Sequence, residues 1–123
     1  MFEITSKLAN LTAPSQTKEV RLLVGGDATL TLIPRTILEG IGVKAVSTLP
    51  FSMSDGREVE REKSSVLLII RGRSAPVTVV FGEVGEKPVL GLTALLGLGL
   101  ILDRTARKLI PCDLRRGTLR FVR

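Results

Sequence analysis

Histidine, tryptophan and tyrosine are absent from the 123 residues, and Cys112 is the only cysteine. A single cysteine excludes an internal disulfide. The absence of histidine excludes Ser-His and Cys-His catalytic pairs and most zinc sites, which use His and Cys ligands. Any catalysis therefore has to use carboxylates, hydroxyls, Lys, Arg or backbone groups. We expect neither a metal ion nor a cofactor.

Long apolar segments are also missing. The longest uncharged apolar run, residues 88–102, has fifteen residues, whereas a membrane-spanning helix needs about 20. The N-terminal residues contain no basic segment followed by an apolar run, so we expect a cytoplasmic protein with no secretory signal and no membrane span. Side-chain amides are limited to Asn10 and Gln16, a scarcity that is also found in thermophilic proteins.

Apolar side chains are abundant by contrast, at 44% of the chain, which predicts one folded domain and excludes a disordered chain. Residues 1–103 have balanced charges, whereas residues 104–123 hold seven basic residues and one acid, Asp113. This basic end could attract phosphates or anionic lipid, or it could be a solvated terminus. We favour the solvated terminus and do not expect nucleic acid as a partner, because Phe121 is its only aromatic side chain for base stacking.

Short apolar segments separated by turn residues predict a mostly β fold with two short helices. Strands are expected at residues 2–8, 19–24, 28–33, 43–53, 57–60, 65–71, 75–81, 100–103, 108–111 and 118–123. One helix is expected at residues 35–39, directly after Pro34, and another at residues 92–96. The domain is expected to cover residues 1–111, with residues 112–123 as a basic tail.

Four motifs follow one another between residues 2 and 111. They are Leu22-Leu23-Val24 with a loop and residues 28–34 after it, a hairpin at Ser54-Asp55-Gly56-Arg57, Val89-Leu90-Gly91 before a short helix, and the strand pair 100–103 and 108–111. In this order and at this spacing, they resemble the retropepsin-like aspartic proteases, above all the small single-domain type of archaea and bacteria.

The resemblance implies a closed acid-protease barrel, a homodimer with a cleft between its two copies, and a peptide or protein substrate. It implies that the hairpin is the flap and that residues 112–123 form a strand at the dimer interface. A monomer remains the alternative to the dimer. The substrate-binding residues that it implies are Ala28, Thr29, Ser54, Asp55, Gly56 and Arg57.

The catalytic triplet departs from the family's Asp-Thr-Gly. An ungapped match of residues 28–34 puts Gly25 at the catalytic Asp position, Gly26 at the Thr position and Asp27 at the Gly position. Aspartic proteases use two carboxylates that share one proton, one from each subunit of a homodimer. Gly25 has no side chain and supplies neither. The resemblance therefore implies an aspartic endopeptidase that is impaired or inactive.

Three alternative functions stay open. In the first, Asp27 meets its symmetry mate and the two act as the acid and base of a protease. We favour instead a structural role in which Asp27 tightens the turn through its own backbone. The domain could also be a peptide-binding module that has lost catalysis and pairs with extended peptides. Finally, it could bind nucleic acid or another anionic surface through its basic tail.

The remaining carboxylates give weaker candidates. Glu58, Glu60 and Glu62 alternate with the basic residues Arg57, Arg61 and Lys63. In a strand this alternation is typical of a solvated face with cross-strand charge pairs. We therefore interpret it as the solvated face of the flap.

Overall fold

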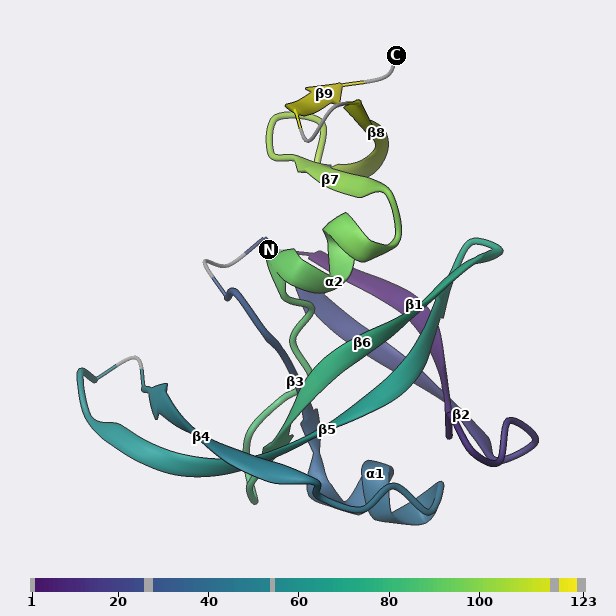
Figure 1. Cartoon of the computed structure of the whole chain (residues 1–123). Coiled ribbons are helices and arrows are strands. Elements are labelled where there is room, and N and C mark those ends of the chain that lie inside the picture. Colours follow the sequence, from purple (N-terminus) through teal and green to yellow (C-terminus); the bar gives the residue numbers. More distant parts are fainter. Residues whose placement is uncertain (1, 26–27, 54, 116–117, 122–123) are drawn as a thin grey trace.

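The computed structural model describes residues 2–25, 28–53, 55–115 and 118–121 (Figure 1). In chain order the first elements are β1 (Phe2–Ala9), β2 (Thr17–Val24), β3 (Thr31–Pro34), α1 (Arg35–Gly40), β4 (Ser47–Ser52) and β5 (Glu58–Ile70). The others are β6 (Arg73–Gly82), α2 (Leu92–Gly97), β7 (Leu100–Asp103), β8 (Lys108–Arg115) and β9 (Thr118–Phe121). This content confirms the predicted mostly β fold with two short helices.

Six strands form the main sheet, in the order β2-β1-β5-β6-β3, and β4 pairs with the outer part of β5. Only the pairing of β3 with β6 is parallel among the described pairs. Strands β7, β8 and β9 make a smaller antiparallel sheet. The predicted boundary between residues 111 and 112 therefore lies inside a strand, β8.

A closed barrel is not found in the strand pairings of the described residues, because β2 and β3 are the two ends of the main sheet. Val89 lies between these ends and forms single bridges with Leu23 of β2 and Leu32 of β3. The N–H of Leu23 donates to the carbonyl of Pro88 at 3.0 Å, and the N–H of Leu32 donates to the carbonyl of Val89 at 3.0 Å. The segment is too short to extend these bridges into a ladder, since Pro88 lacks an N–H and α2 begins at Leu92.

Several predicted strands have different bounds in the structure. Residues 57–60 and 65–71 were expected as separate strands, but residues 58–60 and 65–70 belong to the continuous β5. The ladders of β5 with β4 and with β6 overlap at Lys63, which lies opposite both Ser47 and Val80. Residues 28–30, by contrast, precede β3 and are not part of it.

The hydrophobic core joins both sheets and both helices. It includes Leu38 of α1, Leu68 of β5, Leu95 of α2 and Leu109 of β8. Burial of each such side chain contributes roughly 1.5–3 kcal/mol to stability. Figure 1 shows α1 and α2 at opposite ends of the main sheet and the β4–β5 hairpin extending away from it. No helix in the described part of the chain is long and apolar enough to cross a membrane.

Candidate functional site

The loop that follows β2 begins at Gly25, the residue that the resemblance would put at the catalytic position. Gly25 has a φ of +111°, a backbone conformation that side-chain-bearing residues rarely adopt. Its carbonyl accepts a hydrogen bond of 2.9 Å from Nη1 of Arg104, in the turn after β7. Gly26 and Asp27 lie outside the described residues, so neither proposed role of Asp27 is tested.

The second half of this loop is held by the first two residues of α2. The N–H of Leu92 donates to the carbonyl of Ala28, and the N–H and hydroxyl of Thr93 donate to the carbonyl of Thr29, each at 3.0 Å. These bonds turn residues 28–30 toward α2 and away from the ladder of β3 with β6. The backbone of the predicted substrate-binding residues Ala28 and Thr29 is therefore positioned by α2.

Gly91 allows this close approach. A Cβ atom built on Gly91 would lie 2.3 Å from the carbonyl carbon of Leu30, which no real side chain tolerates. The N–H of Gly91 donates to Oγ1 of Thr31 at 3.0 Å, and Thr31 is fully buried. The glycine of the Val89-Leu90-Gly91 motif is thus required by the contact between two segments about sixty residues apart.

A cavity of about 340 Å³ lies between the loop, α2 and β7. Its lining includes Gly25, Ala28, Thr29, Leu92, Leu95 and Arg104. The structure thus brings together three of the predicted site residues. Leu92 and Arg104 were not predicted, and the sequence contains no signal for Arg104, which lies 79 positions from Gly25.

The described residues that line the cavity are apolar apart from Gly25, Thr29 and Arg104. No carboxylate is among the described residues that line it, so these residues supply no acid and base for proton transfer. The described residues also contain no group of three or more His, Cys, Asp or Glu that could hold a metal ion. The chemistry of this lining is suited to binding an apolar side chain.

The predicted hairpin turn joins β4 to β5. The N–H of Met53 donates to the carbonyl of Arg57 at 2.8 Å, and Gly56 has a φ of +87°. The carboxylate of Asp55 accepts hydrogen bonds from the N–H of Arg57 at 3.0 Å and from its Nε at 2.6 Å. These bonds lower the pKa of Asp55. Asp55, Gly56 and Arg57 are exposed and do not line the cavity, and Ser54 lies outside the described residues.

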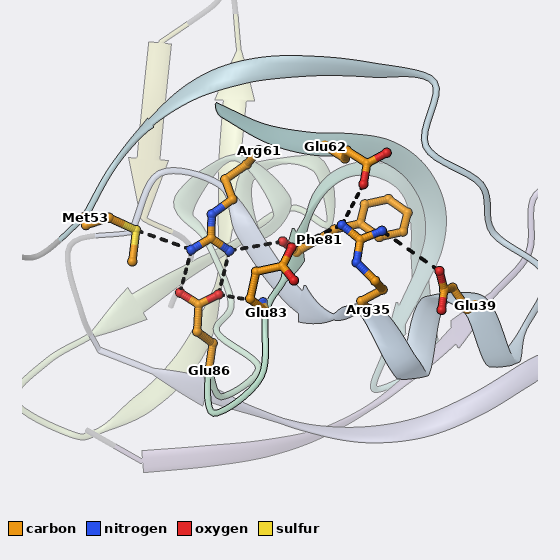
Figure 2. A network of polar contacts seen from close by, with 8 residues as sticks. All are labelled: Arg35, Glu39, Met53, Arg61, Glu62, Phe81, Glu83 and Glu86. Atoms are coloured by element: carbon orange, nitrogen blue, oxygen red, sulfur yellow. Dashed lines mark hydrogen bonds and ion pairs between the residues drawn. The ribbon is translucent and has the colours of Figure 1, made fainter. Parts of the chain in front are cut away.

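The base of the hairpin contains a charged residue that sequence reasoning missed. Arg61 was expected on a solvated face, but only 10% of its side chain is exposed, so that prediction is wrong for Arg61. Its guanidinium forms two hydrogen bonds with the carboxylate of Glu86, at 2.6 and 3.0 Å (Figure 2). It also lies 5.9 Å from the centre of the Phe51 ring, in a cation–π contact that buries it against β4.

A second arginine links the same parts of the molecule. Nη2 of Arg35, the first residue of α1, donates to Glu62 of β5 at 2.6 Å and to Glu83 at 3.1 Å. The Arg35 guanidinium also lies 4.9 Å from the centre of the Phe81 ring. Figure 2 shows both arginines between the hairpin and the loop of residues 83–86.

Comparison with known proteins identified no relative of this chain. Neither a scan against protein-family models nor a search of curated proteins found a match. The resemblance to retropepsin-like proteases consequently remains a prediction based on the four motifs, and the function proposed next is argued from these motifs and from the contacts described above.

Proposed function

We propose that the protein is a homodimeric retropepsin-like domain that binds extended peptides and, with Gly25 at the catalytic position, cleaves them slowly or not at all. The observation that carries the proposal is the contact of Gly91 with Leu30. It gives a physical reason for the family's apolar-apolar-Gly motif at the place where the loop with the altered triplet meets a short helix.

The arrangement of the strands supports the fold part of the proposal. Strand β2, the loop, β3, the hairpin and the segment before α2 follow one another in the family's order. The bridges of Val89 to both ends of the main sheet connect β2 with β3. In the proposed retropepsin-like fold, this segment lies between the two end strands of the sheet and joins them by single bridges.

The loss of catalysis follows from the chemistry of the loop. A carboxylate pair that shares a proton needs one acidic side chain from each subunit at the two-fold axis. Gly25 has none, and its φ of +111° disfavours any replacement with a side chain. The carbonyl of Gly25 is also held by Arg104. A single replacement at this position is therefore strained, and the assay below replaces the whole triplet so that the loop can adopt another backbone conformation.

Strand pairing supports the binding of peptides. Strand β4 pairs with β5 along one edge, and the described residues form no ladder along its other edge. An unpaired strand edge can bind an extended peptide through main-chain hydrogen bonds.

The apolar lining of the cavity supports the dimer. Leu92 of α2 lines the cavity and is 48% exposed. A second copy of the chain would cover this side chain, and two-fold dimers are the commonest closed assemblies. The cleft of the proposed domain is complete only when both copies contribute their loops.

One assay tests the catalytic part of the proposal. The unmodified protein, Asp27→Asn, and the triple variant Gly25→Asp, Gly26→Thr, Asp27→Gly are compared on a mixed peptide library at acidic pH. Circular dichroism checks that each is folded. We expect the unmodified protein to be nearly inactive and the triple variant to cleave, with an acidic optimum because one carboxylate must stay protonated.

Two results would contradict the proposal. Rapid cleavage by the unmodified protein that is lost in Asp27→Asn would assign catalysis to Asp27. If all three folded dimers are inactive and the unmodified protein binds no peptide from the library, the protease-like assignment is wrong. Salt-sensitive binding of nucleic acid in that case would favour the basic end of the chain as the functional region.

A further inference from the structure

We propose that the β4–β5 hairpin and the loop of residues 83–86 move as one unit, and that the Arg61–Glu86 ion pair is the latch between them. This inference concerns the motion of the hairpin and does not depend on peptide binding or cleavage. Three observations support it: the contacts of Arg61, the low exposure of the Arg61 and Glu86 side chains, and a second connection between β5 and the loop through Arg35.

Arg61 connects the hairpin to the loop through both Nη atoms of its guanidinium. On the hairpin side it faces the Phe51 ring, and its Nη2 donates to the sulfur of Met53 at 3.5 Å. On the other side it holds both carboxylate oxygens of Glu86, and its Nη1 donates to the carbonyl of Phe81 at 3.4 Å. If the hairpin moved away from the loop, both hydrogen bonds between Arg61 and Glu86 would have to break together.

The low exposure of the pair makes the connection strong. Exposed fractions are 10% for the Arg61 side chain and 23% for that of Glu86. Exposed ion pairs are weak because water solvates both charges, whereas separation of a buried pair leaves each charge poorly solvated. The ion pair at the hairpin tip is much more exposed: the side chains of Asp55 and Arg57 are 54% and 70% exposed.

The carboxylate of Glu86 also shapes the loop itself. Its Oε1 accepts a hydrogen bond of 2.6 Å from the backbone N–H of Glu83, and the N–H of Glu86 donates to the carbonyl of Glu83 at 3.1 Å. The Glu86 carboxylate therefore both stabilises the loop conformation and binds Arg61.

Arg35 provides the second link between β5 and the loop. It bonds Glu62, the neighbour of Arg61 on β5, and Glu83, the first residue of the loop. The two arginines therefore connect neighbouring residues of β5 to the same loop. Glu39 of α1, 3.9 Å from Arg35, is a further charged group of the network.

The latch is sensitive to acid. The charged groups around Glu86 are Arg61 of β5, Glu83 of its own loop, and Arg35 of α1, which binds Glu83 and Glu62. The hydrogen bond from Arg61 lowers the pKa of Glu86 against the opposing effect of burial. The latch is therefore closed at neutral pH and released when the pH falls through the lowered pKa of Glu86.

NMR-detected amide hydrogen exchange on the full chain tests the latch. The amide of Glu83 reports on the loop, since it donates to Glu86, and the amide of Met53 reports on the hairpin, since it donates to Arg57. We expect Glu86→Gln to accelerate exchange of both amides by about tenfold at neutral pH. The matched control is Asp55→Asn, which removes an exposed carboxylate and should leave Glu83 unaffected.

A double-mutant cycle completes the test. Arg61→Met should also accelerate exchange of Glu83, and it should add little in the Glu86→Gln background. Acceleration at Glu83 without any at Met53 would mean that the loop and the hairpin move independently and would overturn the proposal. Equal acceleration at the core amides of Val66 and Leu68 would indicate loosening of the whole fold and would also overturn it.

Discussion

Gly91 lies so close to Leu30 that a side-chain carbon on the glycine would be 2.3 Å from the Leu30 carbonyl carbon. The contact holds the loop after β2 against the segment before α2, next to the cavity that Thr29 and Leu92 line. Its structural role can be measured separately from any activity.

Gly91→Ala is expected to lower the free energy of unfolding by about 1–3 kcal/mol, because backbone atoms have to move to accept the methyl group. Urea unfolding followed by circular dichroism measures the change. Gly40→Ala is the matched control: the new Cβ meets nothing within 4 Å at the end of α1, and it should be neutral or slightly stabilising. Equal stabilities of the two variants would contradict the assigned role of Gly91.

Thr31→Val tests the buried hydrogen bond beneath the same contact. The substitution keeps the shape of the side chain but removes the acceptor of the Gly91 N–H. We expect a loss of about 1–3 kcal/mol, the cost of leaving a buried donor unpaired. Thr5→Val on the exposed face of β1 is the control and should change stability by less than about 0.5 kcal/mol. A neutral Thr31→Val would show that the N–H finds another acceptor.

The Asp55 carboxyl should titrate below the ordinary range of aspartate, because the N–H and side chain of Arg57 bind its charged form. Carbon-detected NMR titration measures this pKa directly. Since the folded-state pKa is lowered, the favourable interaction exists at neutral pH and disappears as the pH falls through that value. In Arg57→Gln the pKa should rise toward the ordinary value, and an unchanged pKa would rule out the side-chain contribution.

Leu92→Glu is expected to weaken the proposed dimer without unfolding the chain, because the side chain lines the cavity and is 48% exposed. Sedimentation at micromolar concentration should give twice the 13.3 kDa chain mass for the unmodified protein and a single-chain mass for the variant. Leu11→Glu, at another exposed leucine with 41% exposure, should remain dimeric. A single-chain mass for the unmodified protein would refute the dimer.

The elements predicted correctly depend on short-range patterns. In β1 the alternation of Ile4, Ser6 and Leu8 with exposed residues is visible in the sequence, and all three are buried in the structure. The Asp55-Gly56 pair predicted the hairpin turn, because glycine adopts the positive φ that the turn needs. Pro34 marked the start of α1. Each of these signals comes from residues that are neighbours in the chain.

The missed features depend on residues far apart in the chain. Arg61 has the sequence context of a solvated strand, but Phe51 and Glu86 cover it. Residues 28–30 have the composition of a strand, but hydrogen bonds to Leu92 and Thr93 hold them as a loop.

The sequence by itself determined the mostly β class, the hairpin turn and the absence of histidine chemistry, because composition and local periodicity act through neighbouring residues. Only the tertiary structure decided that Gly25 lines an apolar cavity beside Arg104 and that the Arg61 side chain is largely covered where it binds Glu86. These contacts join segments 79 and 25 positions apart. Their burial depends on which segments pack together, and no local pattern encodes that.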